Sequence, residues 1–182
     1  MEHYSHSVSA VLSAVTFLEA LVNEVFQDAA DAHPGRLGSL DGRSQGIMKE
    51  FWDASEGGSR YVGVLEKYQM ALLLAGKAKF DRGSDPYQDA SMLIYLRNRL
   101  VHFRPQTVTH GEEMNEEKRL RGRFVENPLM VNMGNPWFPF KCMGAGCAEW
   151  AWKSSLALAD ERTARLGVVP VYGTDVCSFP EP

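Results

Sequence analysis

The 182-residue chain has little cysteine and no excess of positive charge, and each shortage excludes a class of protein. Its three cysteines, Cys142, Cys147 and Cys177, are an odd number, so no disulfide framework is expected and the thiols are predicted to be reduced. A formal net charge of -4 argues against a general nucleic-acid coat or a membrane-surface protein, because both need a positive field. Any contact with nucleic acid must therefore be local.

Long apolar runs and clustered metal ligands are also missing. The most apolar stretch, residues 8–25, is interrupted by polar residues, and the N-terminus lacks the basic start of a signal peptide, so we expect a cytoplasmic protein with no membrane partner. Cys142 and Cys147 have no second pair at zinc spacing, and we interpret them as apolar residues that pack the start of a helix. Because no glycine-rich phosphate loop is present either, we expect neither a metal nor a cofactor.

Apolar residues recur every three or four positions in several segments, which predicts an all-α fold. The expected main helices are Ser7–Ala32, Tyr61–Phe80, Pro86–Phe103 and Cys147–Leu166, with a shorter helix at Ser44–Ala54. Pro34 and Gly35 should end the first helix, while Asp85 should cap the helix that Pro86 begins. Since a short connection around Gly83 joins two of the helices, these must pack antiparallel. We expect one domain, residues 1–182, built as a bundle of four main helices.

Residues 104–141 interrupt this pattern with repeated proline and glycine, and they are predicted to form a long irregular insertion before the last helix. Weak alternation over Gly122–Met133 is compatible with a short β-hairpin. Trp137, Phe138 and Phe140 are expected to fold back on the helices, or to line an interface. Residues 168–182 are predicted to be an irregular tail. Insertions of this length are usually functional or mobile.

The most informative feature is the polar run at residues 97–102, which ends the helix that begins at Pro86. Asn98 and His102 are four residues apart and share a face, and Arg97 lies one step round the helix. Arginine offers a planar fork to phosphate oxygens, histidine exchanges a proton near neutral pH, and an amide can orient either group. Arg97, Asn98 and His102 are therefore the candidate catalytic residues, with Arg99 and Arg104 as candidate substrate-binding residues.

The run Leu96-Arg97-Asn98-Arg99-Leu100-Val101-His102 resembles the Arg-x4-6-His motif of the HEPN superfamily, the higher-eukaryote and prokaryote nucleotide-binding domains. The segments 17–24 and 147–151 also look like bacterial members. The resemblance implies a HEPN-like bundle, a homodimer with two motifs across a shared cleft, and a metal-independent endoribonuclease, as in a toxin or phage-defence effector with an antitoxin partner. It further implies that Arg97 binds the scissile phosphate, that His102 assists attack by the RNA 2′-hydroxyl, and that Asn98 orients them.

Two other interpretations stay open. The same cleft could hold a nucleotide or a partner protein without catalysis, as in HEPN proteins that serve as binding modules. Alternatively, Arg97 could form an ordinary surface ion pair with Glu19, Glu24 or Asp89, and His102 could simply favour the carbonyl end of the helix dipole. A second basic run, residues 118–123, follows glutamates that partly cancel its charge, so we predict a solvated loop there rather than an RNA-binding rim.

Overall fold

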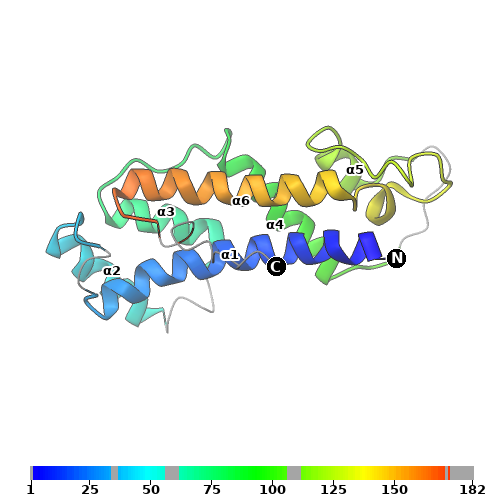
Figure 1. Cartoon of the computed structure of the whole chain (residues 1–182). Coiled ribbons are helices and arrows are strands. Elements are labelled where there is room, and N and C mark those ends of the chain that lie inside the picture. The colour runs from blue at the N-terminus through cyan, green and yellow to red at the C-terminus, as the bar shows by residue number, and fades with distance from the viewer. Residues whose placement is uncertain (1, 34–36, 56–61, 106–111, 171, 173–182) are drawn as a thin grey trace, which may run out of the picture. The chain divides into compact units, whose positions relative to one another are not determined.

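A computed structural model describes residues 2–33, 37–55, 62–105, 112–170 and 172, and over these residues the fold is all-α, with no strand (Figure 1). The helices are α1 (Glu2–Ala30), α2 (Gly42–Ala54), α3 (Val64–Leu74), α4 (Tyr87–Val101), α5 (Asn115–Leu120), the irregular helix η1 (Trp137–Lys141) and α6 (Ala145–Leu166). The expected helix stop at Pro34 and Gly35, the expected helix start at Tyr61, Cys177 and most of the expected tail lie outside the described residues.

The chain divides into two compact units. The first comprises residues 1–20 and 81–158, and the second comprises residues 21–80 and 159–182. Two of the three boundaries between them fall inside long helices, α1 and α6, so each of these helices contributes a segment to each unit. One domain over residues 1–182 therefore stays a prediction.

Helix α1 is amphipathic, as the spacing of its apolar residues predicts. Val11 and Leu18 are fully buried in the first unit, and Phe26 is fully buried in the second. The helix begins at Glu2 and not near Ser7, because Ser7 is itself a buried helical residue and does not cap the chain. Tyr4–Ala30 is also long and apolar enough, by length and composition alone, to cross a membrane, a test that the core helix of a soluble protein passes as well.

In the second unit, α2 forms as expected, whereas α3 is shorter than the predicted Tyr61–Phe80. The Asp41 side chain caps α2 by accepting a hydrogen bond from the Ser44 backbone N–H at 2.9 Å. Helix α3 ends at Leu74 because Gly76 adopts a left-handed conformation, with φ of 65°, which no helix continues through. Phe80 is buried, as its spacing suggested, but it lies in a non-helical segment. The Gln69 side-chain amide holds this segment, because its nitrogen donates to the Phe80 carbonyl oxygen and its oxygen accepts from the Phe80 backbone N–H.

Two cations lie in the interior of this second unit. Arg162 of α6 is 2% exposed, donates to the Leu21 carbonyl at 3.1 Å and lies over the Tyr68 ring. Lys67 is 1% exposed and donates to Asn23 at 2.8 Å. These contacts tie α3 and the end of α6 to the second segment of α1.

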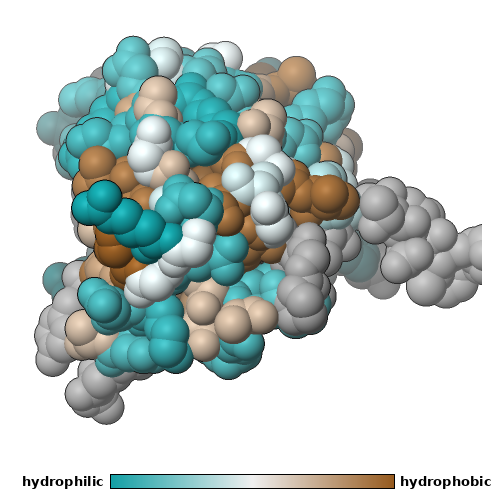
Figure 2. Space-filling view, turned by 90° about the vertical axis from the view of Figure 1, so that its left-hand side faces the viewer, coloured by the Kyte–Doolittle hydropathy of each residue, from teal (hydrophilic) through white to brown (hydrophobic). Residues whose placement is uncertain are grey.

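Figure 2, which looks onto the side where α2 lies, shows apolar residues gathered in a band between polar ones.

In the first unit, α4 begins one residue later than predicted and is not capped by Asp85. Pro86 occupies the N-cap position, where no side chain caps the helix. The first turn is instead closed by backbone hydrogen bonds from Gln88 to Ser84 and from Ala90 to Pro86. Leu93 and Leu96 are fully buried, which confirms the apolar stripe of this helix.

The segment 104–141 contains more helix than its composition predicts. Helix α5 forms there because Leu120 is fully buried and Glu116 and Glu117 are held by arginines, contacts that a charged sequence does not reveal. The short hairpin is not observed, since residues 122–133, all of them described, form turns, bends and an irregular stretch with no strand. Trp137 and Phe138 fold back into the core as expected. Phe140 does not, because it is 42% exposed.

Helix α6 matches the predicted last helix closely, and Gly167, with φ of 70°, ends it. Cys142 and Cys147 are free thiols with no exposed surface, packed at the start of α6 as expected. Burial raises the pKa of the Cys147 thiol to about 12, and burial, followed by the neighbouring Cys147, raises the pKa of Cys142 as well. Neither thiol is therefore a nucleophile at neutral pH.

Candidate functional site

The polar run lies at the C-terminal end of α4, directly after the buried Leu96. Arg97 is half-buried, whereas Asn98 and His102 are exposed. His102 is the C-cap residue, and its backbone N–H donates to the Asn98 carbonyl oxygen at 2.9 Å, which closes the last turn of α4. The Asn98 and His102 side chains thus stand one turn apart and open to solvent.

Arg97 makes no hydrogen bond or ion pair with the residues that the structure describes. Asp89, one of the three acidic residues considered as its partner, is instead paired with Arg123. A half-buried guanidinium without a carboxylate leaves positive charge in the last turns of α4, five residues before the exposed His102. This end of α4 can therefore receive an anion.

Arg99 is held by a different interaction. Its Nε donates to Glu116 Oε1 at 2.5 Å, and the Glu116 side chain is 2% exposed. Nearby, the Arg119 guanidinium lies 4.8 Å from the centre of the Tyr95 ring, and burial, followed by the charge of Glu116, raises the pKa of Tyr95. The charge of Arg99 is thus largely compensated inside the protein, while Arg104 is exposed just beyond the helix end.

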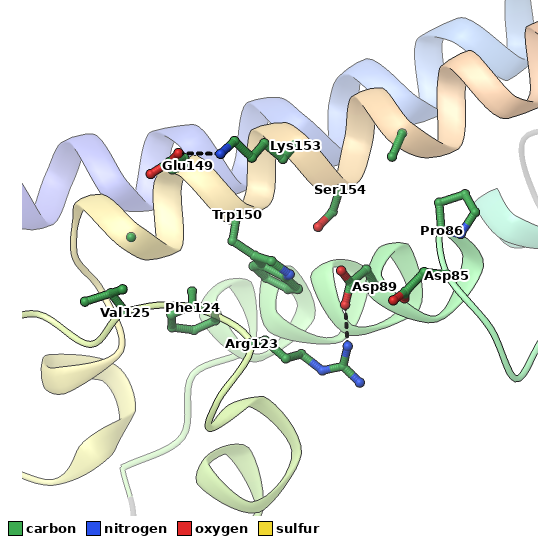
Figure 3. Close-up of a pocket in the computed structure, with 12 residues that line it drawn as sticks. Asp85, Pro86, Asp89, Arg123, Phe124, Val125, Glu149, Trp150, Lys153 and Ser154 are labelled. Atoms are coloured by element: carbon green, nitrogen blue, oxygen red, sulfur yellow. Dashed lines mark hydrogen bonds and ion pairs between the residues drawn. The ribbon is translucent and has the colours of Figure 1, made fainter.

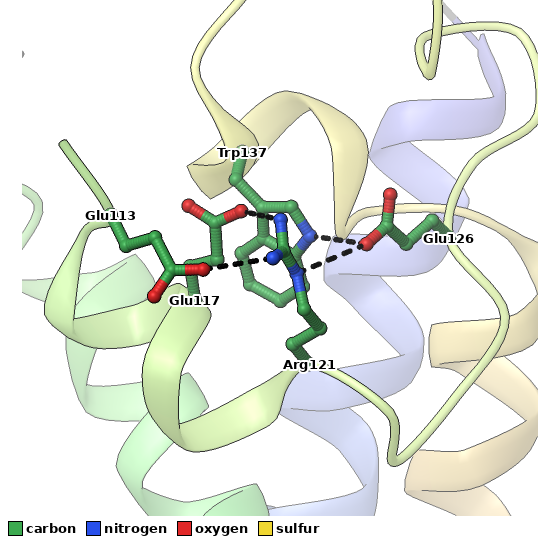
Figure 4. Close-up of polar contacts among 5 residues, drawn as sticks. All are labelled: Glu113, Glu117, Arg121, Glu126 and Trp137. Carbon is green, nitrogen blue, oxygen red and sulfur yellow. Dashed lines mark hydrogen bonds and ion pairs between the residues drawn. The ribbon is translucent and has the colours of Figure 1, made fainter. Parts of the chain in front are cut away.

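Arginine and glutamate side chains form a network around α5 (Figure 4). Arg121 Nη1 donates to Glu113 at 2.9 Å, its Nη2 donates to Glu117, and its Nε lies 3.9 Å from Glu126. Glu126 also accepts a hydrogen bond from the Trp137 indole at 2.7 Å. The second basic run is therefore neither a plain solvated loop nor a free RNA-binding rim, because Arg121 is paired with glutamates and Arg123 with Asp89.

Exposed apolar residues flank the histidine in the chain. Val101 is 54% exposed and Phe103 is 47% exposed, on either side of His102. The Phe103 ring also contacts the buried Phe138, with ring centres 5.9 Å apart, which fixes Phe103 against η1. Apolar side chains are thus exposed on either side of His102 in the chain.

A separate cavity of about 410 Å³ lies at the other end of α4, within the first unit (Figure 3). Its walls include Asp85 and Asp89 at the start of α4, Arg123 and Phe124 after α5, and Trp150 and Ser154 of α6. Sequence reasoning missed it because Asp85 was interpreted as a helix cap and the walls come from three separate segments. The signal that was available is the recurrence of Trp150 and Ser154 on one face of α6, one turn apart.

Among the described residues, no three histidine, cysteine, aspartate or glutamate side chains form a group that could hold a metal ion. No family model, curated protein or solved structure matches this chain.

Proposed function

We propose that this protein is a metal-independent endoribonuclease of HEPN-like type, in which the end of α4 forms the active site. The observation that carries the proposal is an uncompensated Arg97 five residues before an exposed His102 at the end of α4, while Arg99, Arg121 and Arg123 all have carboxylate partners. A phosphate group needs a free guanidinium, and proton transfer near neutral pH needs an accessible imidazole.

In the proposed reaction, Arg97 binds the oxygens of the scissile phosphate and holds it beside His102. The imidazole removes the proton from the RNA 2′-hydroxyl, whose oxygen attacks phosphorus while the bond to the 5′-oxygen breaks. The 5′-oxygen takes up a proton, which leaves a 2′,3′-cyclic phosphate on one fragment and a 5′-hydroxyl on the other. Asn98 orients the imidazole or the substrate, and its exposure in the same face as His102 suits this role.

The substrate-binding residues have unequal roles in this proposal. Arg104 is exposed and provides a second phosphate contact along the RNA backbone. Arg99 contributes less charge because it is bound to Glu116, and it acts mainly by holding α5 against α4. Since the whole chain is acidic, binding rests on these few local charges and weakens steeply with salt.

We further propose that α1, α3, α4 and α6 are the four helices of a HEPN-like bundle and that the active form is a homodimer. Two copies would bring their α4 ends together across a shared cleft. The exposed apolar residues Val101 and Phe103, which flank His102, support this arrangement because apolar surface at such a position favours association. A toxin or phage-defence effector, restrained by an antitoxin partner, is the biological role that fits such an activity.

The test is cleavage of a mixed RNA pool in EDTA by purified protein and its variants. We expect His102→Ala and Arg97→Ala each to lower the rate by roughly 10²- to 10⁴-fold, because proton transfer and phosphate binding are separate requirements. His33→Ala and Arg82→Ala are matched controls, since both residues are exposed and lie outside α4. If the pool stays intact, or if His102→Ala cleaves as fast as the parent, the proposal is wrong.

The non-catalytic alternative gives a different result in the same experiments. A binding module would leave RNA intact, yet RNA would raise its melting temperature, because a ligand of the folded state stabilises that state. Arg97→Ala would abolish that rise. Cleavage by the parent protein would exclude this alternative.

A further inference from the structure

The cavity at the N-terminal end of α4 has the size and lining of a small-molecule site. Its volume of about 410 Å³ falls within the range of ligand pockets. Phe124 and Trp150 give it an aromatic wall, with ring centres 5.1 Å apart, and polar side chains converge on it from α4 and α6. Its position in the chain separates it from His102: Asp89 and His102 are 13 residues apart in one helix, or about 20 Å along its axis.

Trp150 is the residue that most clearly points to a ligand. The side chain is 7% exposed, and its indole N–H finds no hydrogen-bond partner among the described residues. Figure 3 shows the ring descending from α6 toward Asp89, with the nitrogen on the side that faces α4. Buried indole N–H groups usually have a partner, so this donor calls for an acceptor in the cavity. One turn further along α6, the buried Ser154 directs its hydroxyl into the same space (Figure 3).

The charges around the cavity favour a ligand that donates hydrogen bonds. Arg123 is paired with Asp89, and at the rim Lys153 is paired with Glu149 at 2.6 Å, so these four charges cancel. Asp85 has no cationic partner in the described part of the chain, which leaves the cavity with one net negative charge. A carboxylate or phosphate would be repelled, whereas an N–H group would be accepted.

We propose that this cavity binds a nucleobase that carries an amino group next to an unprotonated ring nitrogen, as adenine and cytosine do. The ring nitrogen accepts the indole N–H of Trp150, and the amino group donates to the carboxylate of Asp85 or Asp89. Phe124 and Trp150 pack against the apolar body of the base. This base-binding cavity is independent of the proposed cleavage site, because it uses none of its residues.

Titration calorimetry with pairs of nucleosides tests the proposal. We expect adenosine and cytidine to bind at least about tenfold more tightly than inosine and uridine, because the latter two present a ring N–H and a carbonyl where the cavity needs an acceptor and a donor. Equal affinities within each pair would overturn the proposal. So would the absence of binding by all four nucleosides at millimolar concentration.

Variants locate the binding in the cavity. Trp150→Phe keeps the aromatic wall and removes the N–H, so it should weaken adenosine and cytidine binding about tenfold. Asp85→Asn should weaken it similarly, and because Asp85 is exposed this variant is not expected to disturb folding. Trp152→Phe is the matched control, since Trp152 is 56% exposed on the same helix and should bind like the parent. Unchanged affinity in both Trp150→Phe and Asp85→Asn would contradict the assignment.

Two further experiments distinguish this site from the cleavage site and identify the source of the base. Arg97→Ala and His102→Ala should bind nucleosides as the parent does. Loss of binding in either variant would mean that the base binds at the end of α4 and would overturn the proposal. Comparing adenosine with a short adenosine-containing RNA then distinguishes a free nucleoside from a base within RNA. Equal affinity indicates that the cavity binds a free nucleoside. Tighter binding of the RNA, if Trp150→Phe also weakens it, indicates that the cavity binds a base within an RNA strand.

Discussion

At the scale of single residues, Glu116 shows how a charged sequence hides a structural role. Its side chain is 2% exposed, its Oε1 accepts from Arg99 at 2.5 Å, and its Oε2 has no partner among the described residues. A carboxylate in such a position depends on its one cationic partner. The main role of Arg99 is therefore structural: it stabilises the packing of α5 against α4.

Replacing Arg99 with methionine should lower the free energy of unfolding by about 3 kcal/mol, because it leaves a buried charge unpaired. Arg99 is partly exposed, so the effect lies at the low end for buried pairs. The additional change Glu116→Gln should recover most of the loss. Urea unfolding measures both. Lys153→Met, which breaks the exposed pair with Glu149, should leave the free energy of unfolding nearly unchanged, and an equal loss in the two single variants would contradict this role of Glu116.

The buried thiols predict how stability responds to alkaline pH. Burial raises the pKa of Cys142 and Cys147 above the ordinary value of 9.0, so both stay protonated in the folded state while the unfolded chain ionises. The stability they contribute is complete below pH 9 and falls as pH rises from there toward about 12. In a Cys177→Ser background, alkylation at pH 8 should require unfolding. Rapid labelling of the folded protein would contradict the burial of these thiols.

At the scale of elements, the two glycines Gly46 and Gly146 predict opposite effects of the same substitution. An added Cβ at Gly46 of α2 meets no atom within 4 Å, whereas at Gly146 of α6 it would lie 2.5 Å from the Val125 carbonyl oxygen. Gly46→Ala should stabilise by about 0.5–1 kcal/mol, because alanine loses less conformational freedom in a helix. Gly146→Ala should lower the free energy of unfolding by about 1–3 kcal/mol, because the backbone at Val125 must move to make room for the added methyl group. Thermal unfolding distinguishes them, and a destabilised Gly46→Ala would be inconsistent with this geometry.

The sequence predicted the long amphipathic helices well, because a buried apolar stripe repeats every three or four residues and needs no information from elsewhere in the chain. It failed where tertiary contacts decide the local structure. Phe80 is buried but not helical because Gln69 holds its backbone, and α5 forms because Arg99 and Arg121 hold its glutamates. Such partners are distant in sequence and leave no periodic pattern.

The candidate site was predictable to a similar extent. Helical spacing correctly placed Asn98 and His102 on one exposed face, since Leu96 must point inward. The pairing of Arg99 with Glu116 could not be predicted, because it depends on a helix that the sequence did not reveal. The cavity beside Trp150 was missed for the same reason: its walls come from three separate segments. The catalytic roles of Arg97, Asn98 and His102 stay predictions.

At the scale of the whole molecule, the proposed homodimer predicts a concentration-dependent mass in sedimentation equilibrium. Val101→Glu should shift the protein toward monomer and lower RNA cleavage in parallel, because a charge replaces apolar surface beside His102. Leu73→Glu is the matched control, since Leu73 is 51% exposed on α3, compared with 54% for Val101. A monomeric parent that cleaves RNA, or a Val101→Glu variant that still forms the dimer, would exclude an interface at the end of α4.

The most direct test of the central claim is the chemistry of the ends left by RNA cleavage. A defined oligoribonucleotide incubated with the protein in EDTA should yield fragments with 2′,3′-cyclic phosphate and 5′-hydroxyl ends. A single 2′-deoxy nucleotide at the cleavage position should block the cut, because the 2′-oxygen is the proposed nucleophile. Mass spectrometry of the fragments reads both outcomes. Intact RNA, or fragments with 3′-hydroxyl ends that appear only with a divalent cation, would contradict a cleavage site built from Arg97 and His102.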